Sequence, residues 1–209
     1  MAYTIAILVG SLRKDSFNKK IARSICAIRG DGLDCTMVEI GDLPLYNQDY
    51  DSAAQQPEQY VRFRDQVRSA DGVLFVSPEY NRGIPGVLKN AIDVGSRPYG
   101  KNVFDKKPAA VVTASIGSIG GFGANHQIRQ SCVFLNMPVM AQPEAYLSNV
   151  GDGSFNADGS LKEGGLKDVV TKVAHAFHDW IDMIHRSRAA LAEDTAHLVE
   201  RQKTESQTA

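Results

Sequence analysis

Short apolar segments alternate with amphipathic ones along the chain. Five segments are rich in apolar and β-branched residues, which is typical of strands buried on both faces. They are 4–9, 33–40, 72–77, 108–115 and 139–141. Between them, apolar residues recur at three- and four-residue intervals, which predicts helices over 21–28, 57–70, 87–96 and 125–135. In the second of these helices the expected buried residues are Val61, Phe63, Val67 and Ala70.

A longer amphipathic pattern follows near the C-terminus. Apolar residues keep helical spacing over 166–184, and then become sparse from Arg186 onward. A few apolar residues after that point would continue the helix, but the polar segment 202–209 is expected to be a frayed tail. We therefore expect one domain over 1–185 and a polar helical extension with a frayed tail over 186–209.

Strands that alternate with helices predict an α/β fold, in which helices cover both faces of a parallel sheet. In such sheets ligands bind beyond the carboxyl ends of the strands, where the strand order reverses direction. The loops after the first, third and fourth strands are therefore the candidate ligand site. They are 10–18, 78–86 and 115–123, and they hold the least ordinary residues in the sequence.

Composition and charge exclude several classes of protein. Apolar residues make up 43% of the 209 residues and the net charge is −1, so the chain is not intrinsically disordered and has no field that would recruit nucleic acid or an anionic membrane. The apolar run near the N-terminus is too short for a signal peptide or a membrane span. Cys26, Cys35 and Cys132 show no metal spacing and no disulfide framework, which favours a reducing, cytoplasmic location.

The first loop has the features of an anion site. It joins a buried strand to the start of a helix, where free backbone N–H groups and the positive end of the helix dipole favour a phosphate. Ser11, Ser16 and Asn18 add donors, and Arg13 adds a positive charge. The alternative is that Ser16 only caps the helix and that Arg13 is solvated. Because the donors are so dense, we favour a phosphomonoester site that fits a mononucleotide such as FMN.

Other phosphate sites are excluded by pattern. Asp15, Ser16 and Phe17 stand where a P-loop would end in Gly-Lys-Ser/Thr, and no G-x-G-x-x-G follows the first strand. No cysteine begins a strand-to-helix loop with an arginine six residues later, as a cysteine phosphatase would require. P-loop, Rossmann and cysteine-phosphatase chemistry are therefore disfavoured.

The second and third loops suit a flat ring. Prolines and glycines in 78–86 specify a rigid backbone, while Tyr80 offers an aromatic face and Asn81 an amide that donates and accepts. Glycines in 115–123 allow the backbone to approach a ligand closely. The alternative for 78–86 is a structural turn before a helix. Taken together, the loops predict a phosphate after the first strand and an aromatic ring between the other two.

These motifs resemble a known family. GSLRKDSFN over 10–18, SPEYN over 77–81 with PGVLKNAID over 85–93, and SIGSIGG over 115–121 are similar to the NADPH-dependent FMN reductase family, above all to its chromate- and quinone-reducing branch. The resemblance extends over about residues 4–185. It implies a flavodoxin-like three-layer sandwich with a five-stranded parallel sheet in the order 2-1-3-4-5. It also implies non-covalent FMN and a homodimer or homotetramer.

The resemblance also assigns residues to the cofactor. It implies that the FMN phosphate is held by Ser11, Arg13, Ser16, Phe17 and Asn18. The flavin ring would be lined by Pro78, Glu79, Tyr80, Asn81 and Gly83, with Glu79, Tyr80 and Asn81 near flavin N5. The other side of the ring would be closed by Ser115, Gly117 and Gly120.

Three positions depart from the family pattern. Gly123 and His126 stand where relatives in the chromate-reducing branch typically carry an Arg and a Tyr, and Arg82 replaces a residue that is often uncharged. We interpret Arg82 as a contact for an NADPH phosphate, with a solvated or interface arginine as the alternative. His126 would face the flavin or a neighbouring subunit, with an ordinary surface histidine as the alternative.

The activity implied by the resemblance is two half-reactions at one flavin. NADPH (or NADH) would deliver hydride to FMN, and a quinone, azo dye, chromate or free flavin would then take the electrons in a ping-pong mechanism. This chemistry needs no catalytic side chain and no metal. One rival is a flavodoxin-type electron carrier without NAD(P)H turnover, which the near-zero net charge disfavours. The other rival is a flavin-free scaffold or sensor on the same fold.

Overall fold

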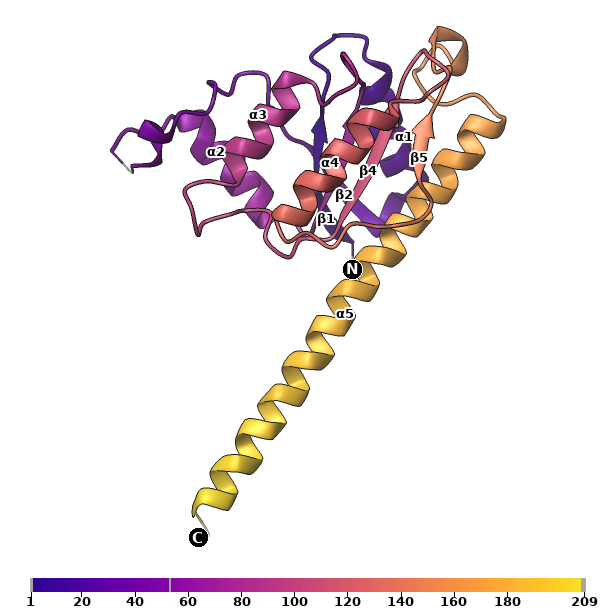
Figure 1. Ribbon diagram of the computed structural model, residues 1–209. Coiled ribbons are helices and arrows are strands. Elements are labelled where there is room, and N and C mark those ends of the chain that lie inside the picture. The colour runs from indigo at the N-terminus through magenta and orange to yellow at the C-terminus, as the bar shows by residue number, and fades with distance from the viewer. Residues whose placement is uncertain (1, 53, 208–209) are drawn as a thin grey trace.

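A five-stranded parallel sheet forms the centre of the molecule, in the order β2-β1-β3-β4-β5 (Figure 1). The computed structural model describes residues 2–52 and 54–207. The strands are β1 (Tyr3–Val9), β2 (Leu33–Met37), β3 (Gly72–Ser77), β4 (Ala109–Ala114) and β5 (Ala145–Leu147). This order confirms the flavodoxin-like fold that the sequence predicts.

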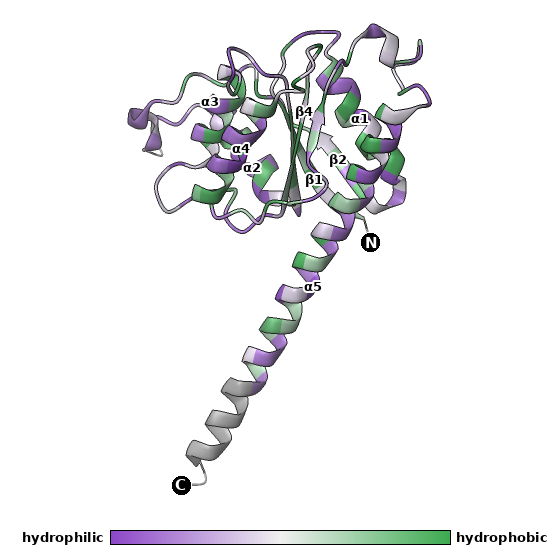
Figure 2. Cartoon of the chain, turned by 45° about the vertical axis from the view of Figure 1, so that its right-hand side comes forward, coloured by the Kyte–Doolittle hydropathy of each residue, from purple (hydrophilic) through white to green (hydrophobic). Residues whose placement is uncertain are grey.

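Helices cover both faces of the sheet, which makes three layers (Figure 2). They are α1 (Phe17–Arg29), α2 (Glu58–Ser69), α3 (Gly86–Gly95), α4 (Phe122–Phe134) and α5 (Gly165–Gln207). Helices α1 and α5 pack on one face, and α2, α3 and α4 pack on the other. Single-turn 3₁₀ helices, Gly30–Gly32, Gln48–Asp51 and Asp152–Ser154, lie in the connections.

The apolar runs in the sequence follow from burial on both faces. In β1, Ile5 and Ile7 point into the core beneath α1 and α5, whereas Ala6 and Leu8 point into the core beneath α2 and α3. Every residue of β3 and β4 is buried. Because successive side chains alternate between the faces, a strand covered on both sides must be apolar at every position.

The predicted fifth strand is wrong. Val139 makes only an isolated bridge to Ala109, and the paired strand lies further along the chain, where Ala145 is opposite Val112. The segment over 139–141 is the more apolar one, but it leaves the sheet after the N–H of Met140 bonds to the carbonyl of Ala109. Edge strands need few apolar residues, and so composition alone misplaces this one.

Helix α2 buries most of the predicted residues. Phe63 and Val67 are buried as predicted, and so is Ala70 just after the helix, whereas Val61 is exposed and Tyr60 and Arg64 are buried. Buried residues at 60, 63, 64 and 67 follow the helical spacing, whereas Val61 lies off that stripe. Arg64 therefore takes a core-facing position that a pattern of apolar residues alone does not reveal.

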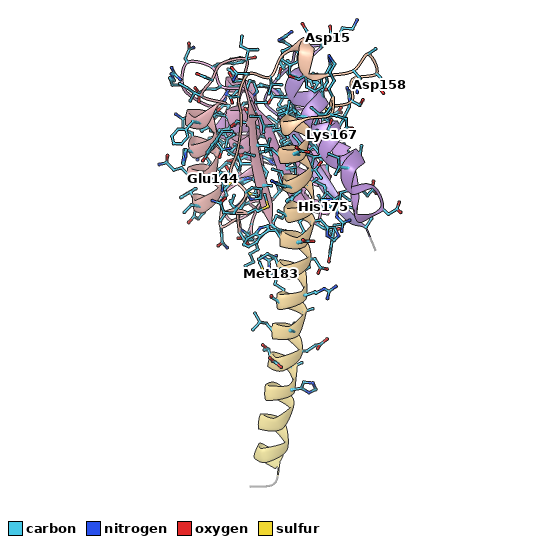
Figure 3. The ribbon with its side chains drawn as sticks, turned by 90° about the vertical axis from the view of Figure 1, so that its right-hand side faces the viewer. Asp15, Glu144, Asp158, Lys167, His175 and Met183 are labelled. Atoms are coloured by element: carbon cyan, nitrogen blue, oxygen red, sulfur yellow. A yellow bond between two sulfur atoms is a disulfide. The ribbon has the colours of Figure 1, made fainter. Side chains whose placement is uncertain are left out.

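Helix α5 extends well beyond the sheet (Figures 1 and 3). Met183 lies near the level at which α5 leaves the domain, and residues 186–197 are exposed (Figure 3). The helix continues to Gln207, past the start of the predicted tail at residue 202, and residues 208–209 lie outside the described part. Among the described residues, no helix is long and apolar enough to cross a membrane. The division at residue 185 stays a prediction.

Cys26 and Cys35 form a disulfide, which corrects the expectation that the cysteines have no disulfide framework. Cys26 lies in the last turns of α1 and Cys35 lies in β2, and their Cα atoms are 6.2 Å apart. The tight turn over Gly30–Gly32 folds β2 back beneath α1, so residues nine apart in sequence become neighbours. Cys132 is a buried free thiol, and burial raises its pKa to about 12.

Thiol titration would check this pairing. We expect the denatured, unreduced protein to expose one titratable thiol and the reduced protein to expose three, since only Cys132 is free. The folded protein should react with a thiol reagent slowly at pH 8, because a thiol with a pKa of about 12 is almost entirely protonated there. Three reactive thiols in the denatured, unreduced protein would contradict the disulfide.

Candidate functional site

A cavity of about 230 Å³ lies at the carboxyl ends of β1, β3 and β4. It is lined by Ser11, Arg13, Ser16, Phe17, Asn18, Pro78, Glu79, Tyr80, Ala114, Ser115 and Ile116. All of these except Ala114 and Ile116 are residues that the sequence analysis assigned to the cofactor. The structure therefore brings the three predicted loops together around one space.

Four assigned residues do not line this cavity. Asn81 and Gly83 lie in the turn beyond Tyr80, and Gly117 and Gly120 lie further along the loop after β4. Gly120 has φ +64°, and a Cβ there would come within 2.6 Å of the Tyr146 carbonyl, so this glycine shapes the loop. Ile116 also lines the cavity although it is exposed, and a single apolar residue in a loop carries no sequence signal for this role.

The loop after β1 prepares the start of α1 for an anion. Ser16 is the N-cap of α1, and its Oγ accepts a bond from the Lys19 N–H at 3.3 Å. Ser16 therefore caps the helix, and it also lines the cavity. The backbone N–H groups of the first helical turn still lack intrahelical acceptors, and no acidic residue lies in that turn. The Arg13 guanidinium lies 5.5 Å from the centre of the Phe17 ring, which keeps its charge at this end of the cavity.

Asn18 has an unpaired atom at the cavity. Its side chain is buried, and its Nδ2 donates to the Ala114 carbonyl at 3.2 Å. Within the described part of the chain, its Oδ1 has no hydrogen-bond partner. Buried polar atoms are nearly always paired, so this oxygen needs a donor from a ligand. An acceptor here suits a hydroxyl of a ribityl chain, which lies next to the phosphate in FMN.

The loop after β3 forms a tight hairpin. Tyr80 and Gly83 exchange backbone hydrogen bonds of 3.1 and 3.0 Å, and Asn81 and Arg82 have positive φ angles of 51° and 64°. Two consecutive positive φ angles define a type I′ turn, which favours asparagine at its first central position. The hairpin leaves the Tyr80 ring half exposed beside the cavity.

Helix α4 holds this hairpin in place. Glu79 Oε2 accepts the backbone N–H of Ala124 at 2.9 Å, which caps a helix whose own N-cap, Gly121, has no side chain. Gln127 accepts from the N–H of Ile84 at 3.0 Å. A Cβ on Gly123 would lie 2.6 Å from the Arg82 carbonyl, so the close contact requires glycine. The structural role of Glu79 could not be found from the sequence, because its partner lies 45 residues away.

Arg82 and His126 lie outside the cavity lining. The Arg82 side chain is 72% exposed, and its Nη1 is 3.5 Å from Glu79 Oε1. His126 packs against Phe122, and its Nε2 is 3.1 Å from the hydroxyl of Tyr146. Burial and the carboxylate of Glu144 raise the pKa of Tyr146.

In the described residues, no group of His, Cys, Asp or Glu side chains is arranged to hold a metal ion.

Residues 3–152 match the family model described as NADPH-dependent FMN reductase. The chain belongs to this family. It is therefore an FMN reductase-type flavoenzyme whose cofactors are FMN and NAD(P)H. The match covers the three loops that line the cavity, as the motifs in the sequence predict.

Curated relatives and a solved structure agree with this family. A quinone reductase from Pseudomonas putida is 51% identical over 87% of this chain and 96% of the relative. A 2-hydroxy-1,4-benzoquinone reductase from a Burkholderia species is 40% identical over 87% of this chain and 97% of the relative. The structure of FerB, a flavoenzyme NAD(P)H:(acceptor) oxidoreductase from Paracoccus denitrificans, has a TM-score of 0.82 at 38% identity and covers 87% of this chain and 98% of that chain.

The contribution of the Glu79 cap on α4 to the stability of this FMN reductase can be measured. Glu79→Ala should lower the free energy of unfolding by about 1 kcal/mol, the usual cost of a lost helix cap. Glu79→Gln should lower it less, because the amide oxygen can still accept the Ala124 N–H. Urea denaturation of both variants gives the comparison. An equal loss in both would mean that the negative charge, and not the hydrogen bond, stabilises the site.

Proposed function

We propose that this protein is an NAD(P)H:quinone oxidoreductase that works by a ping-pong mechanism. The residues of the three loops would hold FMN, which would supply the chemistry for moving two electrons from NADPH or NADH to a quinone. The observation that carries the proposal is the cavity itself, which extends from the start of α1 to the loops after β3 and β4. Relatives of 51% and 40% identity named as quinone reductases support the acceptor class.

At the anion end, each residue has a separate task. The first-turn N–H groups of α1 and the hydroxyl of Ser11 donate to the FMN phosphate, and Arg13 offsets its charge. Asn18 Oδ1 accepts from a ribityl hydroxyl, which uses the atom that has no other partner in the described residues. In this arrangement Ser16 acts mainly through the helix start that it caps.

At the ring end, the protein orients the cofactor with backbone and apolar atoms. Pro78, Glu79 and Tyr80 line one side, and Ser115 and Ile116 line the other. The hydrogen bond from the Ala124 N–H to Glu79 ties the first of these sides to α4. The ring would therefore be held in place without a side chain that titrates in the reaction. Asn81, Gly83, Gly117 and Gly120 support the two loops.

The open side of the ring must admit the nicotinamide and then the acceptor. We assign Arg82 to a phosphate of NADPH, since its guanidinium is exposed next to the hairpin and bound only weakly to Glu79. His126, with Phe122 and Tyr146, would provide an aromatic cluster for a quinone to pack against. Azo dyes, chromate and free flavin are further acceptors that such an open site would admit.

We also propose a homodimer or homotetramer in the cytoplasm. Exposed Tyr99, Val133 and Phe134 offer apolar area for association between copies. A cytoplasmic location suits an enzyme that depends on NAD(P)H, although the Cys26–Cys35 disulfide is unusual for that compartment. A flavodoxin-type electron carrier would bind FMN without NAD(P)H turnover, which the match to the NADPH-dependent FMN reductase family disfavours.

Anaerobic stopped-flow separates these two functions. Mixing the FMN-loaded protein with NADPH should bleach the flavin absorbance, and a later addition of benzoquinone should restore it. Arg82→Ala should raise the KM for NADPH, whereas Arg186→Ala, which removes another exposed and ion-paired arginine, should leave it unchanged. If NADPH and NADH both fail to bleach bound FMN, the electron-carrier alternative is correct.

The assignment of Arg13 predicts a loss of FMN affinity. Arg13→Ala should raise the Kd for FMN about 10- to 100-fold, because it removes a charge-assisted hydrogen bond to phosphate. Lys14→Ala is the matched control, since Lys14 carries the same charge in the same loop but does not line the cavity. Fluorescence titration of the apoprotein measures both values. An equal effect of the two variants would indicate general electrostatic attraction only.

A further inference from the structure

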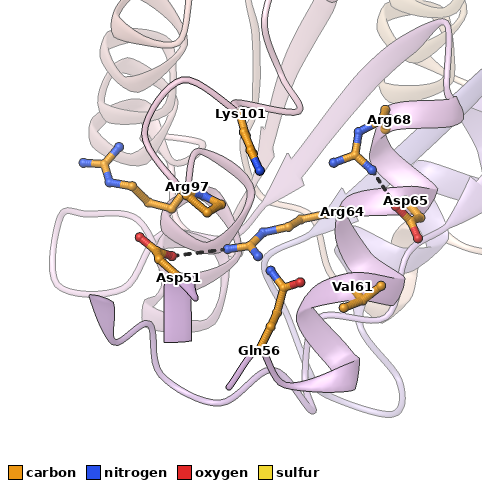
Figure 4. Close-up of a pocket in the computed structure, with 9 residues that line it drawn as sticks. Asp51, Gln56, Val61, Arg64, Asp65, Arg68, Arg97 and Lys101 are labelled. Atoms are coloured by element: carbon orange, nitrogen blue, oxygen red, sulfur yellow. Dashed lines mark hydrogen bonds and ion pairs between the residues drawn. The ribbon is translucent and has the colours of Figure 1, made fainter. Parts of the chain in front are cut away.

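A second cavity, of about 250 Å³, lies between α2 and the loop after α3 (Figure 4). Its walls come from α2, from the segment that precedes α2, and from the loop after α3. Arg64 lies at its centre, with Gln56 and Lys101 directed toward it from opposite sides and Arg97 next to Asp51 (Figure 4). No residue lines both this cavity and the redox cavity.

Arg64 is a buried cation with unused donors. Its side chain is 4% exposed, and its Nε donates to the Val94 carbonyl at 2.9 Å, which fixes the direction of the guanidinium. Among the residues that the structure describes, neither Nη1 nor Nη2 has a hydrogen-bond partner. The guanidinium faces the Tyr60 ring at 5.2 Å, but this contact leaves both nitrogens without a hydrogen-bond acceptor, which is costly for a buried cation.

The neighbouring carboxylate does not satisfy Arg64. Asp51 Oδ1 is 3.8 Å from Nη2, which is beyond hydrogen-bond distance, and the other oxygen of Asp51 accepts the hydroxyl of Tyr46 at 2.9 Å. Even a closer approach of Asp51 would occupy Nη2 and leave Nη1 unpaired. Burial lowers the pKa of Arg64, and Asp51 only partly opposes this effect.

The cavity carries an excess of positive charge. Arg64, Arg68, Arg97 and Lys101 line it, against the carboxylates of Asp51 and Asp65. Asp65 is already bound to Arg68 on the same helix. Two cations at the rim, Arg97 and Lys101, therefore have no carboxylate of their own among the lining residues.

We propose that this cavity binds a phosphate-type oxyanion, with Arg64 as its base and Arg97 and Lys101 at its rim. The planar guanidinium of Arg64 presents parallel N–H groups, which match two oxygens of one phosphate. Gln56 adds an amide donor. The volume admits a phosphate with a small substituent, such as a short phosphomonoester.

Such an anion would join three parts of the chain. It would connect α2 to the loop that contains Arg97 and Lys101, and to the segment around Asp51 and Gln56. Since the site is separate from the redox cavity, its occupation should stabilise the fold without filling the flavin or nicotinamide positions. The ligand would act as a stabilising effector and not as a substrate.

Titration of the FMN-loaded protein in phosphate-free buffer would test this proposal. FMN occupies the anion end of the redox cavity, so a second phosphate must bind elsewhere. Calorimetry should detect one site for inorganic phosphate, and at about ten times its Kd the Tm should rise by about 3–6 °C over sodium chloride of equal ionic strength. Arg64→Met should abolish both signals, whereas Arg62→Met, on the same helix but outside the cavity, should retain them.

Further variants and a second probe distinguish the outcomes. If Arg64→Met does not fold, the double variant Arg97→Met/Lys101→Met keeps Arg64 and should weaken phosphate binding at least tenfold. Tighter binding of glycerol 3-phosphate would identify a phosphomonoester as the ligand, and equal or weaker binding would identify free phosphate. The proposal is overturned if neither probe binds, or if phosphate raises the Tm of Arg64→Met as much as that of the unmodified protein.

Discussion

The parallel ladder between β1, β3 and β4 is the constraint on which the rest of the structure depends. The ladder continues one residue past β1, where the N–H of Gly10 donates to the Val76 carbonyl at 2.9 Å. At this point the chains are so close that a Cβ on Gly10 would lie 2.4 Å from Ser77 Oγ. Because parallel strands end at the same edge of the sheet, this contact places the anion-binding loop beside the hairpin loop.

The positions of the loops at this edge depend on a few polar contacts between segments that are distant in the sequence. Asn18 reaches the end of β4, and Glu79 reaches the start of α4. Each contact joins one of the three loops to an element that borders the loop after β4, so the cavity is formed before any ligand enters. The second cavity has a different character, since Arg64 is fixed by Val94 but its charge is left only partly compensated. Preformed donors with incomplete partners are what distinguish a binding site from ordinary packing.

Local patterns were sufficient where one physical rule dominated. Burial on both faces makes β3 and β4 apolar throughout, and so these strands could be located from composition. The three loops could be identified because glycine, proline and hydroxyl residues gather at strand ends. The same rules failed at β5, where pairing at the sheet edge is set by the path of the chain, and in α2, where Arg64 takes a buried position.

The sequence by itself determined the order of elements, the fold class and the loops that surround the redox cavity, because strand burial and turn chemistry act over a few residues. Only the tertiary structure decided which side chains meet across those loops. The pairing of Cys26 with Cys35, the cap that Glu79 gives to α4, and the unpaired guanidinium of Arg64 all depend on segments brought together by packing. Such contacts produce no repeating pattern in the sequence. Each one depends on how close two separate segments lie in the folded protein and not on the spacing of residues within one segment.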